Sequence, residues 1–185
     1  MPTVNEISDC FELMFKAFHS KEFCKTHKLN HWRESQLLPL IRVGLLCYFE
    51  KQALPEIEVS TPWTQSKKSR IDFRVGNVAI EFAVRNPGKC YTNVSASTNT
   101  TEIKKLMKWT EGKSVLVLFD FSDSPFDMDE LQWYREHPKF GSGNHKKNAY
   151  SVLYFFVAKR RPLATGCYLV QVRRKSRTLD DRRGV

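Results

Sequence analysis

The feature that most constrains the fold is the alternating segment Arg70–Arg85, which is interrupted by Gly76 and Asn77. Apolar and other side chains alternate on both sides of this dipeptide, as is typical of a β-hairpin with a two-residue turn. Counting outward from the turn pairs Asp72 with Glu81 across the two strands. The alternation predicts a core face made of Ile71, Phe73, Val75, Val78, Ile80, Phe82 and Val84, and an opposite face made of Asp72, Arg74, Glu81, Ala83 and Arg85.

The pairing of Asp72 with Glu81 sets two carboxylates against each other. Like charges in opposed positions destabilise a sheet unless a cation or a proton lies between them. A divalent metal such as Mg²⁺ or Mn²⁺ would resolve the conflict, because hard oxygen ligands suit these ions. An equally acceptable interpretation is that Arg70, Arg74 or Arg85 neutralises the pair on a solvated face of the sheet.

The rest of the chain predicts an α/β fold. Apolar residues recur at helical spacing over residues 4–18 and 33–51, and shorter alternating or continuous apolar runs favour strands. The expected order after these two helices is a strand at 57–60, the hairpin, a helix from Thr100 or Thr101 to Trp109, a strand at 114–121, a helix at 129–137, and strands at 151–158 and 166–172. Residues 19–30 read as a polar basic link.

Length and charge suggest one domain and a polyanionic partner. A chain of 185 residues fits a single domain, here residues 1–172, followed by a basic tail at 173–185 that we expect to be mobile. The formal net charge of +10 favours nucleic acid, although charge also simply keeps proteins in solution. No apolar run approaches the roughly 18 residues of a membrane span, so we expect no membrane partner and a cytoplasmic location.

The order helix, three strands, helix, strand over residues 31–121, with Asp72 and the run Glu81-Phe82-Ala83 on the hairpin, resembles the PD-(D/E)XK phosphodiesterase superfamily. The resemblance implies a restriction-endonuclease-like core, a mixed sheet flanked by helices, to which this chain adds an N-terminal helix and two C-terminal strands. It also implies an Mg²⁺- or Mn²⁺-dependent endonuclease that acts on nucleic acid, with DNA as the expected substrate. In that family the metal ligands match Glu34, Asp72 and Glu81.

The sequence departs from the family at Ala83, which stands where the motif has Lys. Possible replacements for that cation are Arg70, Arg85 and the helix residues Lys104 or Lys105, of which the two Lys are preferred because Arg is too basic to accept a proton. The departure also supports an alternative function. In that case the protein would be a catalytically inactive nuclease-like fold that binds nucleic acid or a protein partner.

Basic residues elsewhere predict a phosphate-binding rim around the acidic spot. They are Lys67, Lys68, Lys105, Lys146, Lys147, Arg160, Arg161, Arg173, Arg174 and Lys175.

Cys24, His27 and His31 have the residue types of a zinc site without the spacing of a standard finger. The oligomeric state is open, and a homodimer is compatible with the sequence.

Overall fold

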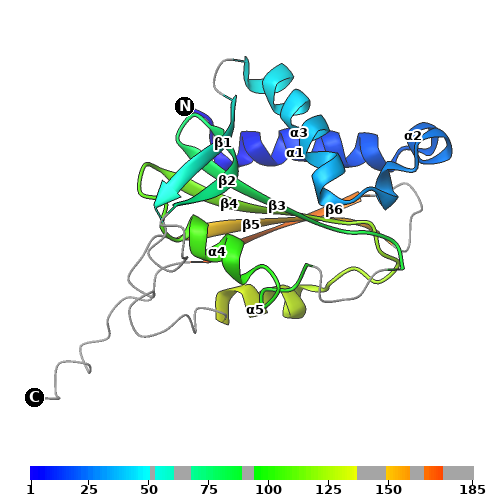
Figure 1. The fold of residues 1–185 in the computed structure, drawn as a ribbon. Coiled ribbons are helices and arrows are strands. Elements are labelled where there is room, and N and C mark those ends of the chain that lie inside the picture. The colour runs from blue at the N-terminus through cyan, green and yellow to red at the C-terminus, as the bar shows by residue number, and fades with distance from the viewer. Residues whose placement is uncertain (51–52, 61–67, 89–93, 137–148, 159–164, 173–185) are drawn as a thin grey trace, which may run out of the picture.

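The computed structural model describes residues 1–50, 53–60, 68–88, 94–136, 149–158 and 165–172 (Figure 1). In chain order the helices and strands are α1 (Val4–His19), α2 (Lys21–Thr26), the 3-10 turn η1 (Leu29–His31), α3 (Glu34–Phe49), β1 (Ala53–Ser60), β2 (Lys68–Val75), β3 (Val78–Arg85), α4 (Thr100–Leu106), β4 (Lys113–Asp120), α5 (Met128–Glu136), β5 (Tyr150–Val157) and β6 (Thr165–Val172). The expected α/β class is confirmed.

A six-stranded mixed sheet in the order β1-β2-β3-β4-β5-β6 forms the centre of the molecule. The pairs β3–β4 and β4–β5 are parallel, and the three remaining pairs are antiparallel. Parallel neighbours need a crossover, which α4 and α5 supply. The central strands β3 and β4 are buried on both faces, which explains the continuous apolar run at Ser114–Phe121.

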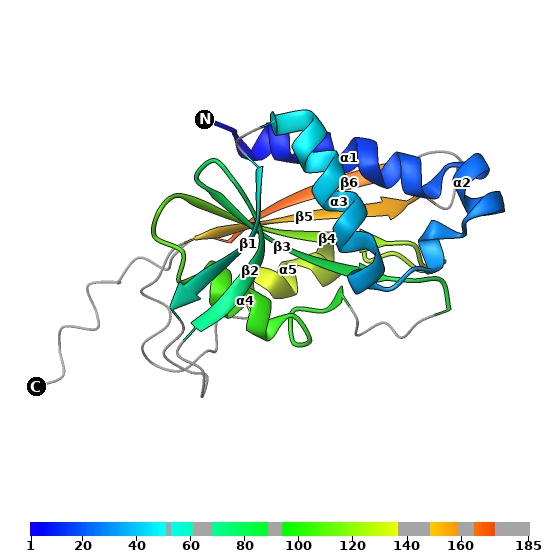
Figure 2. The same ribbon diagram turned by 45° about the horizontal axis from the view of Figure 1, so that its top comes forward.

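Helices cover both faces of this sheet, which gives three layers (Figures 1 and 2). Helices α1 and α3 lie on one face and enclose the larger apolar cluster, in which Phe15 and Phe119 pack edge to face with ring centroids 5.0 Å apart. Helices α4 and α5 lie on the other face with a second cluster that includes Ile103 and Leu131. No helix in the described ranges has the length and apolar character that crossing a bilayer requires.

The hairpin register predicted from Gly76 is confirmed for its first three pairs, the last of which joins Phe73 to Ile80. Gly76 adopts φ 58°, a left-handed value that suits the first central residue of a tight hairpin turn. The indole Nε1 of Trp109 donates a hydrogen bond of 3.1 Å to the Asn77 carbonyl. The segment that follows α4 therefore contacts the turn from the side of the second cluster.

Two expectations are wrong in detail. The supposed link at 19–30 contains α2 and η1. Ser20 caps the start of α2, because its side-chain oxygen accepts a hydrogen bond from the Phe23 amide. Ile71 does not share the cluster of Phe73 but packs in the second cluster, with Ala83 among its members. The reason is that the pairing of β2 with β3 ends at Phe73, and the part of β2 before Phe73 pairs with β1 alone.

Candidate active site

Asp72 lies where β2 parts from β3. In a continued ladder the Phe82 amide would bond to the carbonyl of Ile71. Instead, the Phe82 N–H donates to Oδ2 of Asp72 at 2.9 Å. A side-chain carboxylate thus replaces a backbone acceptor, which opens the hairpin at this point and holds the Asp72 carboxyl group beside β3.

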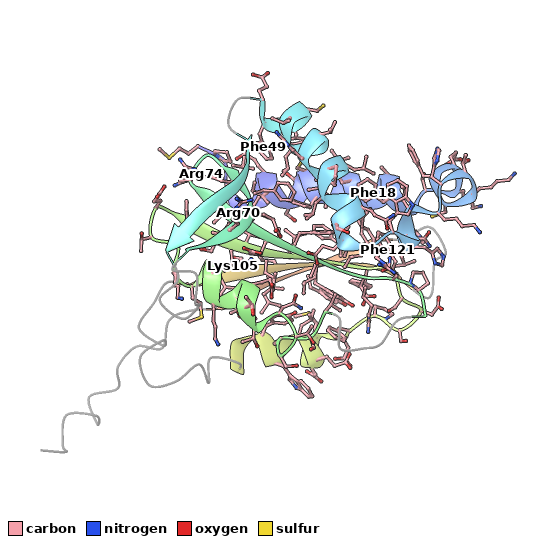
Figure 3. All side chains as sticks on the ribbon, viewed as in Figure 1. Phe18, Phe49, Arg70, Arg74, Lys105 and Phe121 are labelled. Atoms are coloured by element: carbon pink, nitrogen blue, oxygen red, sulfur yellow. The ribbon has the colours of Figure 1, made fainter. Side chains whose placement is uncertain are left out.

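Glu81 is the most deeply buried acid of the candidate site, with only 1% of its side chain exposed. Its Oε2 accepts a hydrogen bond of 2.9 Å from Nζ of Lys105, the half-buried lysine of α4 that Figure 3 labels between that helix and the sheet. Its Oε1 is buried and has no partner among the described residues. Burial, then the negative charge of Asp72, raises the pKa of Glu81 well above its ordinary value.

Glu34 reaches the same place as the first residue of α3. The start of this helix is fixed because Nδ2 of Asn86, just after β3, donates 2.8 Å hydrogen bonds to the carbonyls of Asn30 and Trp32. Glu34 as a whole residue is exposed, so the burial that acts on it concerns its carboxyl end. Burial, followed by the negative charges of Asp72 and Glu102, raises its pKa to about 7.

Helix α4 brings one base and one acid to the cluster. Ile103 and Leu106 anchor the helix in the second apolar cluster, and Lys105 points from it toward Glu81. Burial lowers the pKa of Lys105, but the attraction of Glu81 and the nearby acids outweighs it, so the net shift is upward. Glu102, one turn earlier, is close enough to raise the pKa of Glu34, Asp72 and Glu81.

The pKa of Asp72 is also raised, chiefly by burial, while the Phe82 amide and the charge of Lys105 act in the opposite direction. Three carboxyl groups with raised pKa values around one ammonium form a site that is short of positive charge. Lys105, Asp72, Glu81 and Glu34 come from four different elements, α4, β2, β3 and α3. We refer to these four residues with Glu102 as the acidic cluster.

Among the proposed replacements for the motif lysine, Lys105 is the one whose ammonium reaches Glu81. Lys104 is the adjacent helix residue and is rotated by about 100° around the axis of α4. Arg70 is exposed and lies opposite Glu58 of β1. Counting outward from the Gly76-Asn77 turn would place Arg70 opposite Ala83, but β2 and β3 have already parted at this point.

Arg85 serves a different part of the fold. It is four residues beyond Glu81, about 13 Å along the strand. Its Nε donates 2.9 Å to Oδ1 of the fully buried Asp120, and its Nη2 donates to Oδ2 of the same carboxylate and to the Ser124 carbonyl. The Tyr154 hydroxyl completes this buried network by donating to Asp120. Arg85 is therefore occupied at the carboxyl ends of the parallel strands.

Most of the predicted phosphate-binding rim lies outside the described residues. This holds for Lys67, Lys146, Lys147, Arg160, Arg161, Arg173, Arg174 and Lys175, for the side chain of Lys68, and for the predicted mobile tail at 173–185. Lys105, assigned to the rim by sequence, lies within the acidic cluster instead.

No group of three or more His, Cys, Asp or Glu side chains in the described ranges is arranged to hold a metal ion. At the weak zinc pattern, Cys24 donates a hydrogen bond from Sγ to the Phe18 carbonyl. Within the acidic cluster, the Lys105 ammonium supplies the positive charge beside Glu81.

Glu102 and Asp120 were missed by sequence reasoning. The spacing of Glu102 and Lys105, three residues apart on one helix face, is a signal that points to Glu102 once Lys105 is assigned. Asp120 ends an apolar strand, and its partner Arg85 is 35 residues away, so no local pattern reveals it. Comparison of the chain with protein-family models, curated proteins and solved structures gave no match.

Proposed function

We propose that this protein is a metal-dependent nuclease that hydrolyses phosphodiester bonds of nucleic acid, with DNA as the expected substrate. The observation that carries the proposal is the convergence of Glu34, Asp72 and Glu81 with Lys105 at the point where the hairpin opens. Acids that have raised pKa values and lie beside a specific charge partner are typical of functional sites. A purely structural cluster would be expected to pair its charges more completely.

The element order supports the same proposal. From α3 to β4 the chain runs helix, three strands, helix, strand, which is the order of the PD-(D/E)XK core that the sequence resembles. The acids stand at the start of the first of these helices and on the second and third strands. We assign Lys105 of α4 to the role of the motif lysine that Ala83 has vacated, because the Lys105 ammonium contacts the Glu81 carboxylate and Ala83 is two residues from Glu81 on the same strand.

The donor atoms of the acidic cluster suit Mg²⁺ or Mn²⁺. Both ions prefer carboxylate oxygens, and Oε1 of Glu81 is a buried oxygen without a partner among the described residues. Glu34, Asp72 and Glu81 are the residues that would hold the ion. When bound, the ion would supply Lewis-acid chemistry that makes a water more acidic and offsets charge on the phosphate.

The chain's own residues would position the substrate and stabilise charge. Lys105 has a raised pKa and stays protonated at neutral pH, so its role is to donate hydrogen bonds to a phosphate oxygen rather than to act as a base. The Phe82 amide fixes the Asp72 carboxylate in one orientation. Glu34 is exposed where Asp72 is half-buried and Glu81 is buried, so it is the acid that a substrate can reach most readily.

One observation favours a second function, nucleic-acid binding without cleavage. Lys105 already neutralises Glu81 by a 2.9 Å ion pair, and Ala83 leaves the usual motif position without a cation. If that pair persists, the ammonium takes the place of a metal, and the cluster is a structural device inside a binding protein.

Cleavage assays separate the two functions. Purified protein should be incubated with supercoiled plasmid, linear duplex, single-stranded DNA and RNA in Mg²⁺, Mn²⁺ or EDTA. The nuclease proposal expects cleavage of at least one DNA substrate with metal, none in EDTA, and none by Glu81→Gln. The matched control is Glu111→Gln, an exposed acid that pairs with Arg74 away from the cluster, and it should cut normally.

Metal binding provides a readout that does not depend on substrate choice. Mn²⁺ at about 100 times its Kd should stabilise the folded protein by about 2.7 kcal/mol through mass action. The increase in Tm should disappear in Glu81→Gln and remain in Glu111→Gln. Absence of both cleavage and a metal-dependent Tm shift would leave the binding function.

A further inference from the structure

Residues 20–33, which we call the basic arm, form a small ordered unit at the end of α1 (Figures 1 and 2). The arm contains α2 and η1 and leads directly into α3. It lies at the edge of the molecule, beyond the sheet and away from the N-terminus of the chain. The sequence had predicted only a polar basic link over most of this range, without helices.

The arm is held rigidly against the core. Leu29 is 4% exposed and joins the larger apolar cluster. The indole Nε1 of Trp32 donates 3.1 Å to the His27 carbonyl, and Asn86 donates to the carbonyls of Asn30 and Trp32. These hydrogen bonds satisfy several backbone carbonyls of the arm, and its Lys and Arg side chains are exposed.

The charges of the arm are almost all positive. Within the described part of the chain, none of its four Lys and Arg side chains takes part in an ion pair, and each is exposed. A single acid, Glu22, accompanies them. The four cations are Lys21, Lys25, Lys28 and Arg33. Unpaired cations close together on a fixed scaffold are suited to bind successive phosphates.

An exposed aromatic residue lies on the same short helix as Lys21 and Lys25. Phe23 of α2 is 45% exposed, although α2 has no buried residue that would explain an apolar side chain here. Its ring lies 6.0 Å from the His27 ring at an interplanar angle of 38°. Aromatic rings beside cations form the usual platform on which unpaired bases stack. A paired base within a duplex keeps its faces on its neighbours, so the ring favours single strands.

The arm is close to the acidic cluster along the chain. Arg33 immediately precedes Glu34, and Lys28 is six residues before it. Six residues span at most about 20 Å, which corresponds to about six nucleotides of a strand at 3.4 Å each. A strand that contacts Lys28 can therefore reach the acidic cluster within about its next six nucleotides, and the rest of the arm would hold nucleotides further along the strand.

We propose that the basic arm binds single-stranded nucleic acid next to the acidic cluster, with Lys21, Lys25 and Lys28 on phosphates and Phe23 stacked on a base. The inference rests on the proposed function insofar as nucleic acid is the partner, and it adds the strand type and the surface that holds it. The substrate class is then a single strand, or a duplex end or branch with unpaired nucleotides.

Binding measurements in EDTA test the arm without cleavage. Fluorescence anisotropy should compare a labelled oligothymidine with a duplex of equal length. In Lys21→Gln/Lys25→Gln the affinity for the single strand should fall about tenfold at low salt, and the log–log salt slope should fall in magnitude by about 1.4, at roughly 0.7 per phosphate contact. Phe23→Ala should weaken single-strand binding about fivefold or more and duplex binding less than twofold.

The matched control is Arg42→Gln/Lys113→Gln, which removes two exposed cations outside the arm and should bind as the native protein does. Thermal unfolding must give similar Tm values for all variants. Three results would overturn the inference. The arm variants could bind within twofold of native, the control could lose as much affinity as they do, or the arm could bind phosphatidylserine vesicles in place of the oligonucleotide. Metal-dependent cleavage together with unchanged binding by the arm variants would contradict the proposal for the arm and leave the nuclease proposal intact. Loss of binding in the arm variants without any metal-dependent cleavage would support the arm and contradict the nuclease proposal.

Discussion

The ammonium of Lys105 lies 2.9 Å from Oε2 of Glu81, and the lysine side chain is 14% exposed where the glutamate is 1% exposed. The two residues are 24 positions apart and come from a helix and a central strand. Removal of one partner from a buried ion pair leaves an uncompensated charge, which costs far more than the pair contributes. This contact therefore links the stability of the fold to the chemistry of the acidic cluster.

Lys105→Met should lower the free energy of unfolding by about 2–4 kcal/mol at pH 7, because Glu81 must then stay charged without a partner or bind a proton. Urea unfolding provides the measurement. In a double-mutant cycle, Glu81→Gln should recover part of the loss and give a coupling of about 1 kcal/mol or more. A loss for Lys105→Met no larger than that for the exposed Lys113→Met would contradict the buried pair.

Asp120→Asn should be among the most destabilising single changes, at about 3–5 kcal/mol. The substitution leaves the 2% exposed Arg85 without its counter-charge and puts an amide where the Tyr154 hydroxyl donates. Asp123→Asn, an exposed residue three positions on, is the matched control and should change stability by less than about 0.5 kcal/mol. Equal effects of the two changes in urea unfolding would show that the network carries little stability.

Metal-free protein should become less stable as pH rises from about 5 to 8, through the contribution of Glu34. Its pKa is about 7 when folded and near 4.5 when unfolded, so the folded state holds the proton more tightly. The stabilisation is complete below about pH 4.5 and is lost as pH passes through 7. The measurement is the difference in Tm between native protein and Glu34→Gln across this range.

The Tm of the native protein minus the Tm of Glu34→Gln should be more positive at pH 5 than at pH 8, and it can become negative at pH 8. The comparison with Glu34→Gln also cancels the opposite contribution of His19, whose pKa is lowered by burial. A pH-independent difference would mean that the Glu34 carboxyl group is fully solvated in the folded protein.

Gly112→Ala should destabilise the protein by about 3 kcal/mol. A Cβ at this position would lie 2.1 Å from the backbone oxygen of Asn77, and the backbone of a tight turn cannot move aside easily. Gly44→Ala is the matched comparison, because its Cβ would meet only the flexible end of Met14 at 2.4 Å. The loss for Gly44→Ala should be clearly smaller, and the reverse order in thermal unfolding would contradict the tight approach at the turn.

Much of the fold follows from local patterns in the sequence. The alternation around Gly76 determines the hairpin register as far as Phe73 and Ile80, because a two-residue turn allows one pairing and one core face. Helical spacing in the same way located α1 and α3, and continuous apolar runs located β4. The same counting placed Asp72 opposite Glu81. The ladder ends one pair earlier, yet Asp72 still lies close enough for its charge to raise the pKa of Glu81, so the sequence predicted that these acids are neighbours but not how they meet.

The tertiary structure decided which groups complete that pair. Whether Lys104 or Lys105 faces Glu81 depends on the rotation of α4 about its axis, and one residue changes that direction by about 100°. The hydrogen bond from the Phe82 amide to the Asp72 carboxylate ends the ladder, and Ile71 then faces the other cluster. This is a side-chain contact, which no hydrophobic periodicity can predict. Arg85 finds Asp120 only because parallel pairing sets the ends of β3 and β4 side by side. Periodicity specifies how one element faces the core, whereas contacts between elements depend on how they pack, and the chemistry of this cluster arises from those contacts.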